Sequence, residues 1–408
     1  MEMNYASGLV FVFSMLFLIF SLFTLIEIVN DKSMVKQKKR DVKNEGNKLS
    51  NENYNLLNAL VNFDLKSAID RVSIISYNIL SQKFAKLNKR LCQENINFDN
   101  RLRTILKEIT ELESDIICLQ EVNLEVLNQF FLRPLIIYGY YVLYGRNEGS
   151  NFLNLTAFKT SKFKLISSKN FKISLENHSS LFIGNRGVFK VELIHNLSGK
   201  CFVIYNVHFP WRPHLEYIKC VVLSIILEDI SNLYNNLHNI LICGDFNSLP
   251  NSLVLKLMYF DIEREFFENT KKLYKINKIS EDNLIPQKLY YQILRQPNES
   301  TNFEKIQSNL YKLTKKLWFR SAYENYQIFK KNLEVNENDI NYTDNHPQFT
   351  NFTRKFCGNI DYIFYSQNLN LSKILKLVTR EELENQTSLP SLKYPSDHLK
   401  IYAEFLIK

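Results

Sequence analysis

Short apolar runs alternate with helical patterns along most of the chain. The run Val72–Leu80 (VSIISYNIL) precedes apolar residues at helical spacing between Leu102 and Leu112, and DIICLQEV follows at 115–122. Apolar runs of about four to eight residues favour strands, whereas a recurrence every three to four residues favours an amphipathic helix. The strand, helix, strand order from residue 71 onward predicts an α/β sandwich.

Further apolar runs continue this alternation toward the C-terminus. An apolar helix at about 215–233 joins two of them. The segment 261–316 breaks the pattern because it is rich in Lys, Asn and Gln and has little strand character, and we expect a surface excursion that is partly helical. The predicted strands are 155–158, 188–193, 201–208, 239–245, 360–365 and 399–406.

The N-terminal region has a different pattern. Residues 8–26 are apolar or hydroxylated throughout, and this stretch is long enough to span a bilayer as a helix. Basic residues follow it closely, between residues 32 and 40, and none precedes it, so the positive-inside rule places the C-terminal bulk in the cytosol. We expect residues 1–30 to form a single-pass anchor that contacts the membrane through 8–29. The alternative is a signal segment that, with the basic leader after it, directs the chain to the secretory route or an organelle lumen.

The composition of the chain indicates a polar tether and an excess of basic residues. Residues 31–70 are polar and charged, which predicts a basic tether ahead of a globular domain at 71–408. The net charge of +9 favours a polyanion such as RNA or an anionic membrane surface, although Lys and Asn are abundant throughout and a general composition bias explains the charge equally well. Six scattered cysteines without a CxxC pair argue against a disulfide framework or a zinc site.

Polar groups suited to a metal or a phosphate lie at or beside the ends of nearly every predicted strand. Each has an ordinary alternative when taken singly, such as a structural histidine, a turn or a helix cap. Because an α/β fold gathers the ends of its strands from distant parts of the sequence, their joint occurrence predicts one shared site. The groups are Asn78, Gln120-Glu121, His208, Gly244-Asp245-Phe246-Asn247, Asp361 and Ser396-Asp397-His398.

Hydrolysis of a phosphodiester accounts for these residue types. The reaction needs a hard cation to neutralise developing charge, an activated water and a stabilised leaving oxygen. Mg²⁺ takes one or two carboxylates and keeps several waters, so we expect Glu121 to be a metal ligand. Asn78 is expected to support that carboxylate or to bind the same ion.

The same ordered series resembles a known family. Asn, Gln-Glu, Asn-x-His, Gly-Asp-Phe-Asn, Asp-Tyr-Ile and Ser-Asp-His are similar to the signature of the endonuclease/exonuclease/phosphatase superfamily, across 71–408 apart from the excursion. The longer strings ICGDFNSLPNS, FRSAYENY, FTNFTRKFCGNIDYIFYS and LPSLKYPSDHLKIYAEF resemble the branch of carbon-catabolite-repressor type deadenylases, nocturnin, angel proteins and 2′-phosphodiesterases. The resemblance implies a four-layer α/β sandwich, in which two packed mixed β-sheets are flanked by helices.

This resemblance also implies roles for individual residues. It implies that Asp245 and Asn247 position the attacking water and the phosphate. His398 is implied to contact the scissile phosphate or to act as a base, with Asp361 fixing its tautomer in the manner of a His-Asp pair. Asp397 is implied to be a second carboxylate ligand of the metal.

Three further positions follow from the resemblance. His208 is implied to be a phosphate contact. In the deadenylase branch an aromatic residue before Asp-Tyr-Ile stacks on the terminal base, and a proline after the histidine strand lies near it. The candidates are Phe349, Phe352, Phe356 and Pro213. Phe352 is favoured for stacking, and core packing is the alternative for each phenylalanine.

We therefore expect a phosphodiester hydrolase that uses one or two Mg²⁺ ions, with Mn²⁺ as the alternative metal. The leading hypothesis is a 3′-exoribonuclease of deadenylase type that acts on poly(A) or other RNA 3′ ends. The alternatives are an NADP(H) 2′-phosphatase or 2′-phosphodiesterase, and a sphingomyelinase-like phospholipid hydrolase, which the membrane segment suits. A membrane-tethered RNA-binding pseudoenzyme comes last, because every expected catalytic position carries a suitable residue type.

Overall fold

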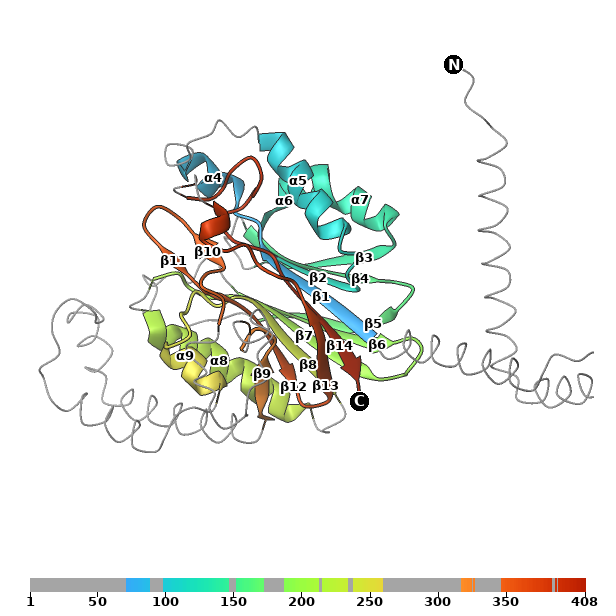
Figure 1. Ribbon diagram of the computed structural model, residues 1–408. Coiled ribbons are helices and arrows are strands. Elements are labelled where there is room, and N and C mark those ends of the chain that lie inside the picture. Colours follow the sequence, from blue (N-terminus) through green and yellow to red (C-terminus); the bar gives the residue numbers. More distant parts are fainter. Residues whose placement is uncertain are drawn as a thin grey trace, which may run out of the picture. The chain divides into compact units, whose positions relative to one another are not determined.

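The apolar runs form two mixed β-sheets with a shared core between them (Figure 1). Within the described residues, the first sheet is six-stranded, in the order β13 (Leu369–Ile374), β14 (Ile401–Ile407), β1 (Arg71–Asn78), β2 (Ile116–Asn123), β4 (Phe152–Lys159) and β3 (Tyr140–Arg146). The second is also six-stranded, in the order β5 (Phe163–Phe171), β6 (Val188–His195), β7 (Cys201–His208), β8 (Asn239–Asp245), β12 (Asp361–Ser366) and β9 (Phe319–Ser321). The predicted α/β architecture with two mixed sheets is confirmed.

The computed structural model describes residues 71–408 with several gaps. All described residues belong to one compact unit, residues 67–408. They are 71–88, 98–146, 152–171, 187–212, 215–233, 238–259, 317–324, 326, 346–383, 386 and 388–408.

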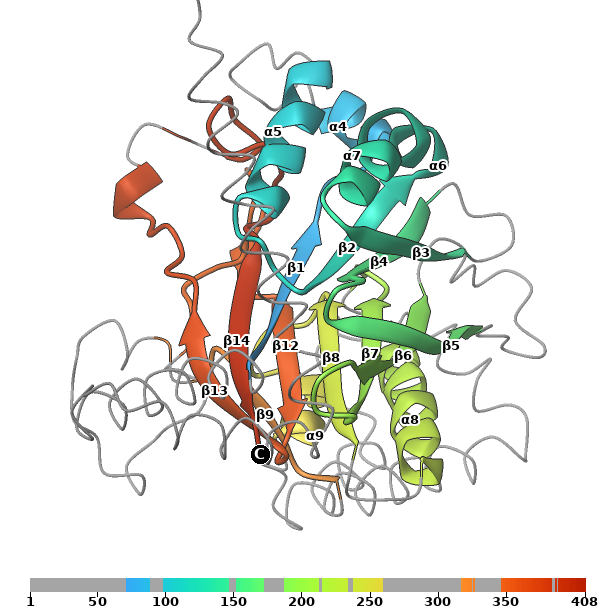
Figure 2. The ribbon, with the colours of Figure 1, turned by 90° about the vertical axis from the view of Figure 1, so that its right-hand side faces the viewer.

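Helices cover the outer face of each sheet (Figures 1 and 2). The first sheet carries α5 (Phe98–Thr110), α6 (Leu124–Val126), the π-helical turn η1 (Leu127–Phe131) and α7 (Leu132–Ile137), and the second carries α8 (Glu216–Asn232) and α9 (Leu253–Met258). One apolar cluster fills the space between the sheets, and one further cluster lies under each helical layer. Burial of these three clusters is the main favourable contribution to folding.

Strand alternation decides which side chains enter the layer between the sheets. On β8, Leu241 and Cys243 belong to the cluster between the sheets, whereas Ile242 belongs to the cluster under α8 and α9. Side chains alternate with a period of two along a strand, so Asp245 points into the same layer as Cys243. By the same alternation Asn78 on β1 follows the inward-facing Ile74. The polar ends of the central strands therefore project into one end of the apolar core.

The topology brings these strand ends together. Each sheet holds one parallel pair, β1 with β2 and β7 with β8, and the pairings around them are antiparallel. The carboxyl ends of a parallel pair meet at one edge, which is where α/β sheets bind ligands. A short pair of strands, β10 (Asn351–Phe352) and β11 (Cys357–Gly358), lies beside this edge and bridges to His398 through Asn351.

The predicted membrane segment, the tether and the excursion at 261–316 lie outside the described residues. In the part of the chain that the structure does describe, no helix has both the length and the apolar character that crossing a bilayer requires. The three assignments therefore stay predictions.

Gly244 allows β7 and β8 to approach closely. Its φ is +140°, and a Cβ atom there would lie 1.9 Å from the carbonyl oxygen of Val207 on β7. The next residues along the two strands, His208 and Asp245, are paired in the same register. The glycine thus sets the distance at which these two polar side chains enter the site.

We expect Gly244→Ala to lower the free energy of unfolding by at least about 3 kcal/mol, because the methyl group forces β8 away from β7. Gly199→Ala is the matched control, since Gly199 also has a positive φ of +68° but has nothing within 4 Å of its Cβ position. The control should lose about 1–2 kcal/mol from backbone strain alone. Denaturant titration of the two variants measures the difference, and equal losses would contradict the prediction.

Candidate active site

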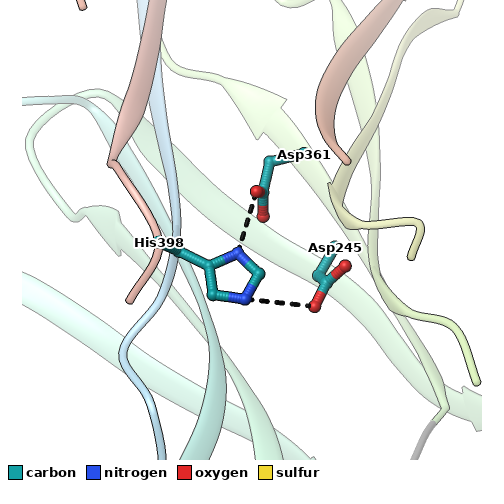
Figure 3. A group of neighbouring side chains, drawn as sticks. All are labelled: Asp245, Asp361 and His398. Carbon is teal, nitrogen blue, oxygen red and sulfur yellow. Dashed lines mark hydrogen bonds and ion pairs between the residues drawn. The ribbon is translucent and has the colours of Figure 1, made fainter. Parts of the chain in front are cut away.

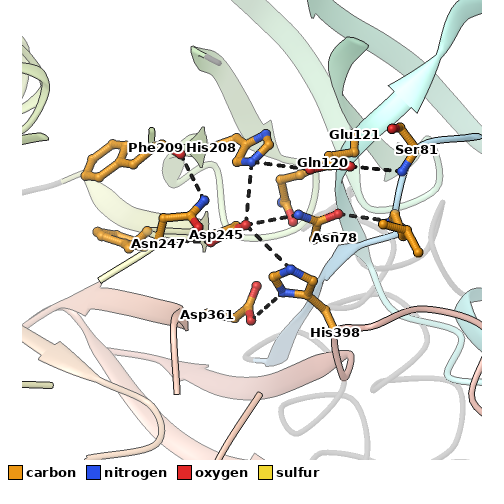
Figure 4. Close-up of polar contacts among 12 residues, drawn as sticks. Asn78, Ser81, Gln120, Glu121, His208, Phe209, Asp245, Asn247, Asp361 and His398 are labelled. Atoms are coloured by element: carbon orange, nitrogen blue, oxygen red, sulfur yellow. Dashed lines mark hydrogen bonds and ion pairs between the residues drawn. The ribbon is translucent and has the colours of Figure 1, made fainter. Parts of the chain in front are cut away.

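The residues that follow the central strands converge at one end of the layer between the sheets (Figure 4). Asn78 and Glu121 come from the parallel pair of the first sheet, and His208 and Asp245 come from that of the second. Asp361 opens β12 and pairs with Asp245 across the antiparallel ladder. These five predicted residues are all buried and lie within one group.

His398 lies between two carboxylates (Figure 3). Its Nδ1 is 2.9 Å from Oδ2 of Asp361, and its Nε2 is 3.7 Å from Oδ2 of Asp245. The hydroxyl of Thr350 donates to the same Asp361 oxygen at 2.6 Å and accepts the backbone N–H groups of Ile360 and Asp361, each at 3.0 Å. Asp361 is therefore fixed from two sides, and it orients the imidazole with Nε2 toward Asp245.

Asp245 is the centre of the hydrogen-bond network. Its Oδ2 accepts from Nδ2 of Asn78 at 3.0 Å and lies 3.5 Å from Nε2 of His208. Its Oδ1 accepts the backbone N–H of Asn247 at 2.8 Å, which closes a tight turn in which Asn247 has a φ of +48°. The amide of Asn247 also donates to the carbonyl of Phe209 at 2.9 Å. The Gly-Asp-Phe-Asn sequence thus forms a turn, and this turn places Asp245 and Asn247 in the site.

The electrostatics of this group follow from burial and from mutual charge. Burial raises the pKa of Asp245 to about 7, and Asp361 acts in the same direction while the charge of His398 opposes both. Burial lowers the pKa of His398, but the carboxylates of Asp361 and Asp245 outweigh it and hold this pKa well above its ordinary value. The site therefore sets a carboxyl group that titrates near neutrality beside an imidazolium ion.

Glu121 reaches the site through a bulge in β2. The register against β4 shifts between Leu119 and Val122, and Glu121 has a φ of +61°. Leu119 packs under the outer helices, so a regular strand would turn Glu121 outward as well. The bulge redirects the carboxylate inward, where Oε2 accepts the N–H of Ser81 at 2.9 Å and Oε1 lies 3.7 Å from Nε2 of His208.

Hard oxygen donors crowd around this point, and they fit a divalent cation such as Mg²⁺ or Mn²⁺. Glu121 and Asp245 both approach Nε2 of His208, and Asp245, Asp361 and His398 offer ligand atoms within 4.8 Å of one another. Asp397 is also buried, and burial raises its pKa as well. A bound cation would stabilise the ionised carboxylates and so offset the cost of their burial.

The polar group forms part of the wall of a cavity of about 760 Å³. The cavity reaches from Glu121, Asp245 and His398 to apolar side chains on the surrounding segments. These apolar residues are Leu80, Phe84, Trp211, Leu249, Phe356 and Ile360. Asp397 also lines the cavity, whereas Pro213 lies outside the described residues.

The structure does not bring Phe352 to the cavity. Its side chain is 2% exposed and packs against Phe349, with a ring-to-ring distance of 5.6 Å, while the guanidinium of Arg380 lies 4.1 Å from the ring centroid. Phe356, four residues further on, is 38% exposed and lines the cavity. Phe356 rather than Phe352 therefore offers an aromatic ring to the cavity, because β10 turns Phe352 into the core.

Sequence reasoning missed Lys219, which supports the turn that carries Asn247. Lys219 is 1% exposed, and its ammonium lies 2.5 Å from the carbonyl oxygen of Asn247, 3.3 Å from Oγ of Ser248 and 3.5 Å from Glu216. Burial lowers its pKa, and the charge of Glu216 opposes this. A lysine inside the apolar run of α8 was the available signal, since lysine is rarely buried without such partners.

Arg101 is a second residue that the sequence did not reveal. Its guanidinium donates to the carbonyl groups of Ile79 at 2.7 Å, Leu80 at 2.8 Å and Pro395 at 3.1 Å. Arg101 thus ties the exit of β1 to the loop that carries His398. The sequence gave no sign of this role, because the partners of Arg101 are backbone carbonyl groups, which every residue carries.

Comparison with known proteins bears on the whole of this region. A family model described as the endonuclease/exonuclease/phosphatase family matches residues 75–398. The CCR4-Not complex 3′-5′-exoribonuclease subunit Ccr4 of Candida albicans is 25% identical over 83% of this chain and 41% of its own length. The probable Ccr4 subunit of Enterocytozoon bieneusi is 28% identical over 88% of this chain and 70% of its own length. Human 2′,5′-phosphodiesterase 12 is 24% identical over 82% of this chain and 51% of its own length. The chain thus spans between 41% and 70% of the length of these relatives.

Two solved structures share the fold. ANGEL2, a 2′,3′-cyclic phosphatase in complex with adenosine-2′,3′-vanadate, superposes with a TM-score of 0.60 at 22% identity, over 83% of this chain and 96% of that one. The human Nocturnin catalytic domain with bound sulfate superposes with a TM-score of 0.53 at 20% identity, over 83% of this chain and 94% of that one. The resemblance read from the motifs, including its deadenylase and nocturnin branch, is confirmed. Because the family match runs through every strand-end residue from Asn78 to His398, the chain belongs to the endonuclease/exonuclease/phosphatase family.

Proposed function

We propose that this protein is a divalent-metal-dependent phosphodiester hydrolase of deadenylase type, which shortens RNA from its 3′ end. The observation that carries the proposal is the placement of Asp245 between His398 and His208, beside Glu121, in the wall of an open cavity. This arrangement provides a proton acceptor, a cation and oxygen donors for a metal at one point. The relatives named as 3′-5′-exoribonucleases support RNA as the substrate class.

The residues divide the chemistry between them. Glu121, with Asn78 and Asp397 as further donors, would hold a divalent cation, which would neutralise phosphate charge and lower the pKa of a water bound to it. Asp245, which lies between the imidazoles of His208 and His398, takes the proton of the attacking water. The imidazolium of His398 donates to a phosphoryl oxygen as charge builds on it, and Asp361 keeps the ring oriented.

Two further predicted residues complete this assignment. His208 shares a carboxylate oxygen of Asp245 with His398, and it is a second donor toward the phosphate. Asn247 sits in the turn held by Asp245, and it positions the water and the phosphate at the cavity wall.

Hydrolysis of a 3′-oligoadenylated RNA tests the proposal directly. We expect stepwise 3′ shortening with Mg²⁺, loss of activity in EDTA, and a fall in kcat of at least about a hundredfold in Glu121→Gln. Glu125→Gln is the matched control, because Glu125 is an exposed residue of the neighbouring α6 and should leave kcat unchanged. RNA that stays intact with Mg²⁺ and with Mn²⁺ would reject the exoribonuclease assignment.

A second candidate substrate is a 2′,5′-linked oligoadenylate, which the human 2′,5′-phosphodiesterase 12 relative favours. The same assay distinguishes the two linkages, since each oligomer is presented separately. Release of inorganic phosphate from NADP(H), without shortening of either oligomer, would instead favour a phosphatase that acts on dinucleotides.

Phe356 and Phe352 provide a paired test of the cavity's aromatic wall. We expect Phe356→Ala to raise KM for RNA by roughly 5- to 150-fold, the value of one base stack, and to leave stability nearly unchanged. Phe352→Ala should instead cost about 3–5 kcal/mol of stability, because it empties a buried site. Thermal unfolding and steady-state kinetics of both variants measure this split. A reversal of the two effects would return the stacking role to Phe352.

We also propose that residues 8–29 anchor the protein in a membrane with the catalytic domain in the cytosol. The support is the uncharged apolar run 8–26 within this segment and the basic tether that follows it. We expect the full chain to stay with membranes at alkaline pH, and a variant lacking residues 1–30 to be released. Protease added outside sealed vesicles should digest the catalytic domain. Complete alkaline extraction of the full chain, or protection from protease, would count against the anchor or its orientation.

A further inference from the structure

Trp211 is a large apolar side chain left in contact with solvent beside the site. It lies in the loop that follows His208 at the end of β7, it is 57% exposed, and it lines the same cavity as Glu121 and Asp245. A single exposed aromatic residue needs no special explanation on an ordinary surface. An exposed indole in the wall of a catalytic cavity is different, because it presents a flat face to whatever binds there.

The neighbour of Trp211 strengthens this point. Arg212 is also exposed, and its guanidinium carbon lies 5.6 Å from the centroid of the indole ring. An aromatic face with a guanidinium beside it matches a nucleotide, since the ring stacks on a base and the guanidinium pairs with a phosphate. Neither residue belongs to the group of carboxylates and histidines around Asp245.

The cavity also holds a second aromatic surface from a different part of the fold. Phe356, between β10 and β11, is likewise exposed and lines the cavity, and Lys355 beside it adds a positive charge. The two aromatic residues come from separate loops, one after β7 of the second sheet and one next to the short β10-β11 pair. A cavity of about 760 Å³ lies in the upper part of the range for ligand pockets, so it has room for more than one base.

We propose that Trp211 and Arg212 form a second nucleotide position, in which Trp211 stacks on a base other than the one that Phe356 holds. The inference deepens the proposed function and rests on it. On this assignment the cavity takes a strand of at least two nucleotides, with one base on Phe356 and another on Trp211. Binding then strengthens as the strand extends from one nucleotide to several.

Intrinsic fluorescence tests this position, because the chain contains two tryptophans and each can be left alone. Trp318 is the matched control, since it is also 57% exposed but lines a different hollow with Arg320 and Lys408. The measurements use the full chain with EDTA, which prevents turnover. The Trp318→Phe variant keeps Trp211 as its remaining indole, and we expect oligoadenylate to quench its fluorescence. The Trp211→Phe variant, which keeps Trp318, should not be quenched. AMP at the same nucleotide concentration should quench Trp211 far less than the oligomer.

Kinetics supply the second readout. Trp211→Ala should raise KM for oligoadenylate by roughly 5- to 150-fold with kcat within about twofold, whereas Trp318→Ala should change neither value. Trp211→Phe should recover most of the loss, because it restores a stacking surface. A fall in kcat without a change in KM would indicate a structural role and overturn the inference.

The fluorescence outcomes separate this inference from the proposed function. Quenching of Trp211 by the oligomer without Mg²⁺-dependent hydrolysis would keep the nucleotide position and reject the exoribonuclease. Hydrolysis without quenching, equal quenching of Trp318, or equal quenching by AMP would overturn the second nucleotide position and leave the proposed activity standing.

Discussion

The burial of several carboxyl groups between two apolar sheets is the constraint on which the site depends. Asp245, Asp361 and Asp397 are buried next to a core of aliphatic and aromatic side chains. Taking a carboxylate out of water is costly unless hydrogen bonds or opposite charges replace the solvent. The imidazoles, the amide of Asn78 and the hydroxyl of Thr350 provide part of this replacement, and a bound divalent cation would provide more of it.

The two sheets contribute to this centre in a similar way. Each carries a parallel pair near its middle, and each pair delivers its polar residues from its carboxyl end. Small departures from regular geometry then complete the arrangement. Gly244 allows β7 and β8 to approach closely, and the bulge at Glu121 turns its side chain toward the site. Asn247 takes a left-handed turn, and the ammonium of Lys219 donates to its carbonyl oxygen. These departures lie at the site, whereas the apolar core next to it follows the ordinary alternation of strands.

The sequence predicted the inner strands of the two sheets well and their edge strands poorly. All of the inner strands of both sheets were anticipated, because a strand buried on two faces is a continuous apolar run. The edge strands β3, β5, β9 and β13 were missed, since one face of an edge strand meets solvent and its pattern is mixed. Within the site, the strand-end residues were predicted from their types and order. Thr350 and Arg101 were not, because their roles rest on contacts between segments that are distant in the chain.

The position of β14 has a consequence for the order in which the site is completed during synthesis. This strand lies between β13 and β1, and the loop that leads into it carries Asp397 and His398. A ribosome must therefore extend the chain through Ile407 before the strand that pairs with β1 can be inserted. Until then the nascent chain holds most of its catalytic groups but lacks the imidazole that faces Asp245. The imidazole of His398 thus reaches Asp245 only together with the closure of the first sheet by β14.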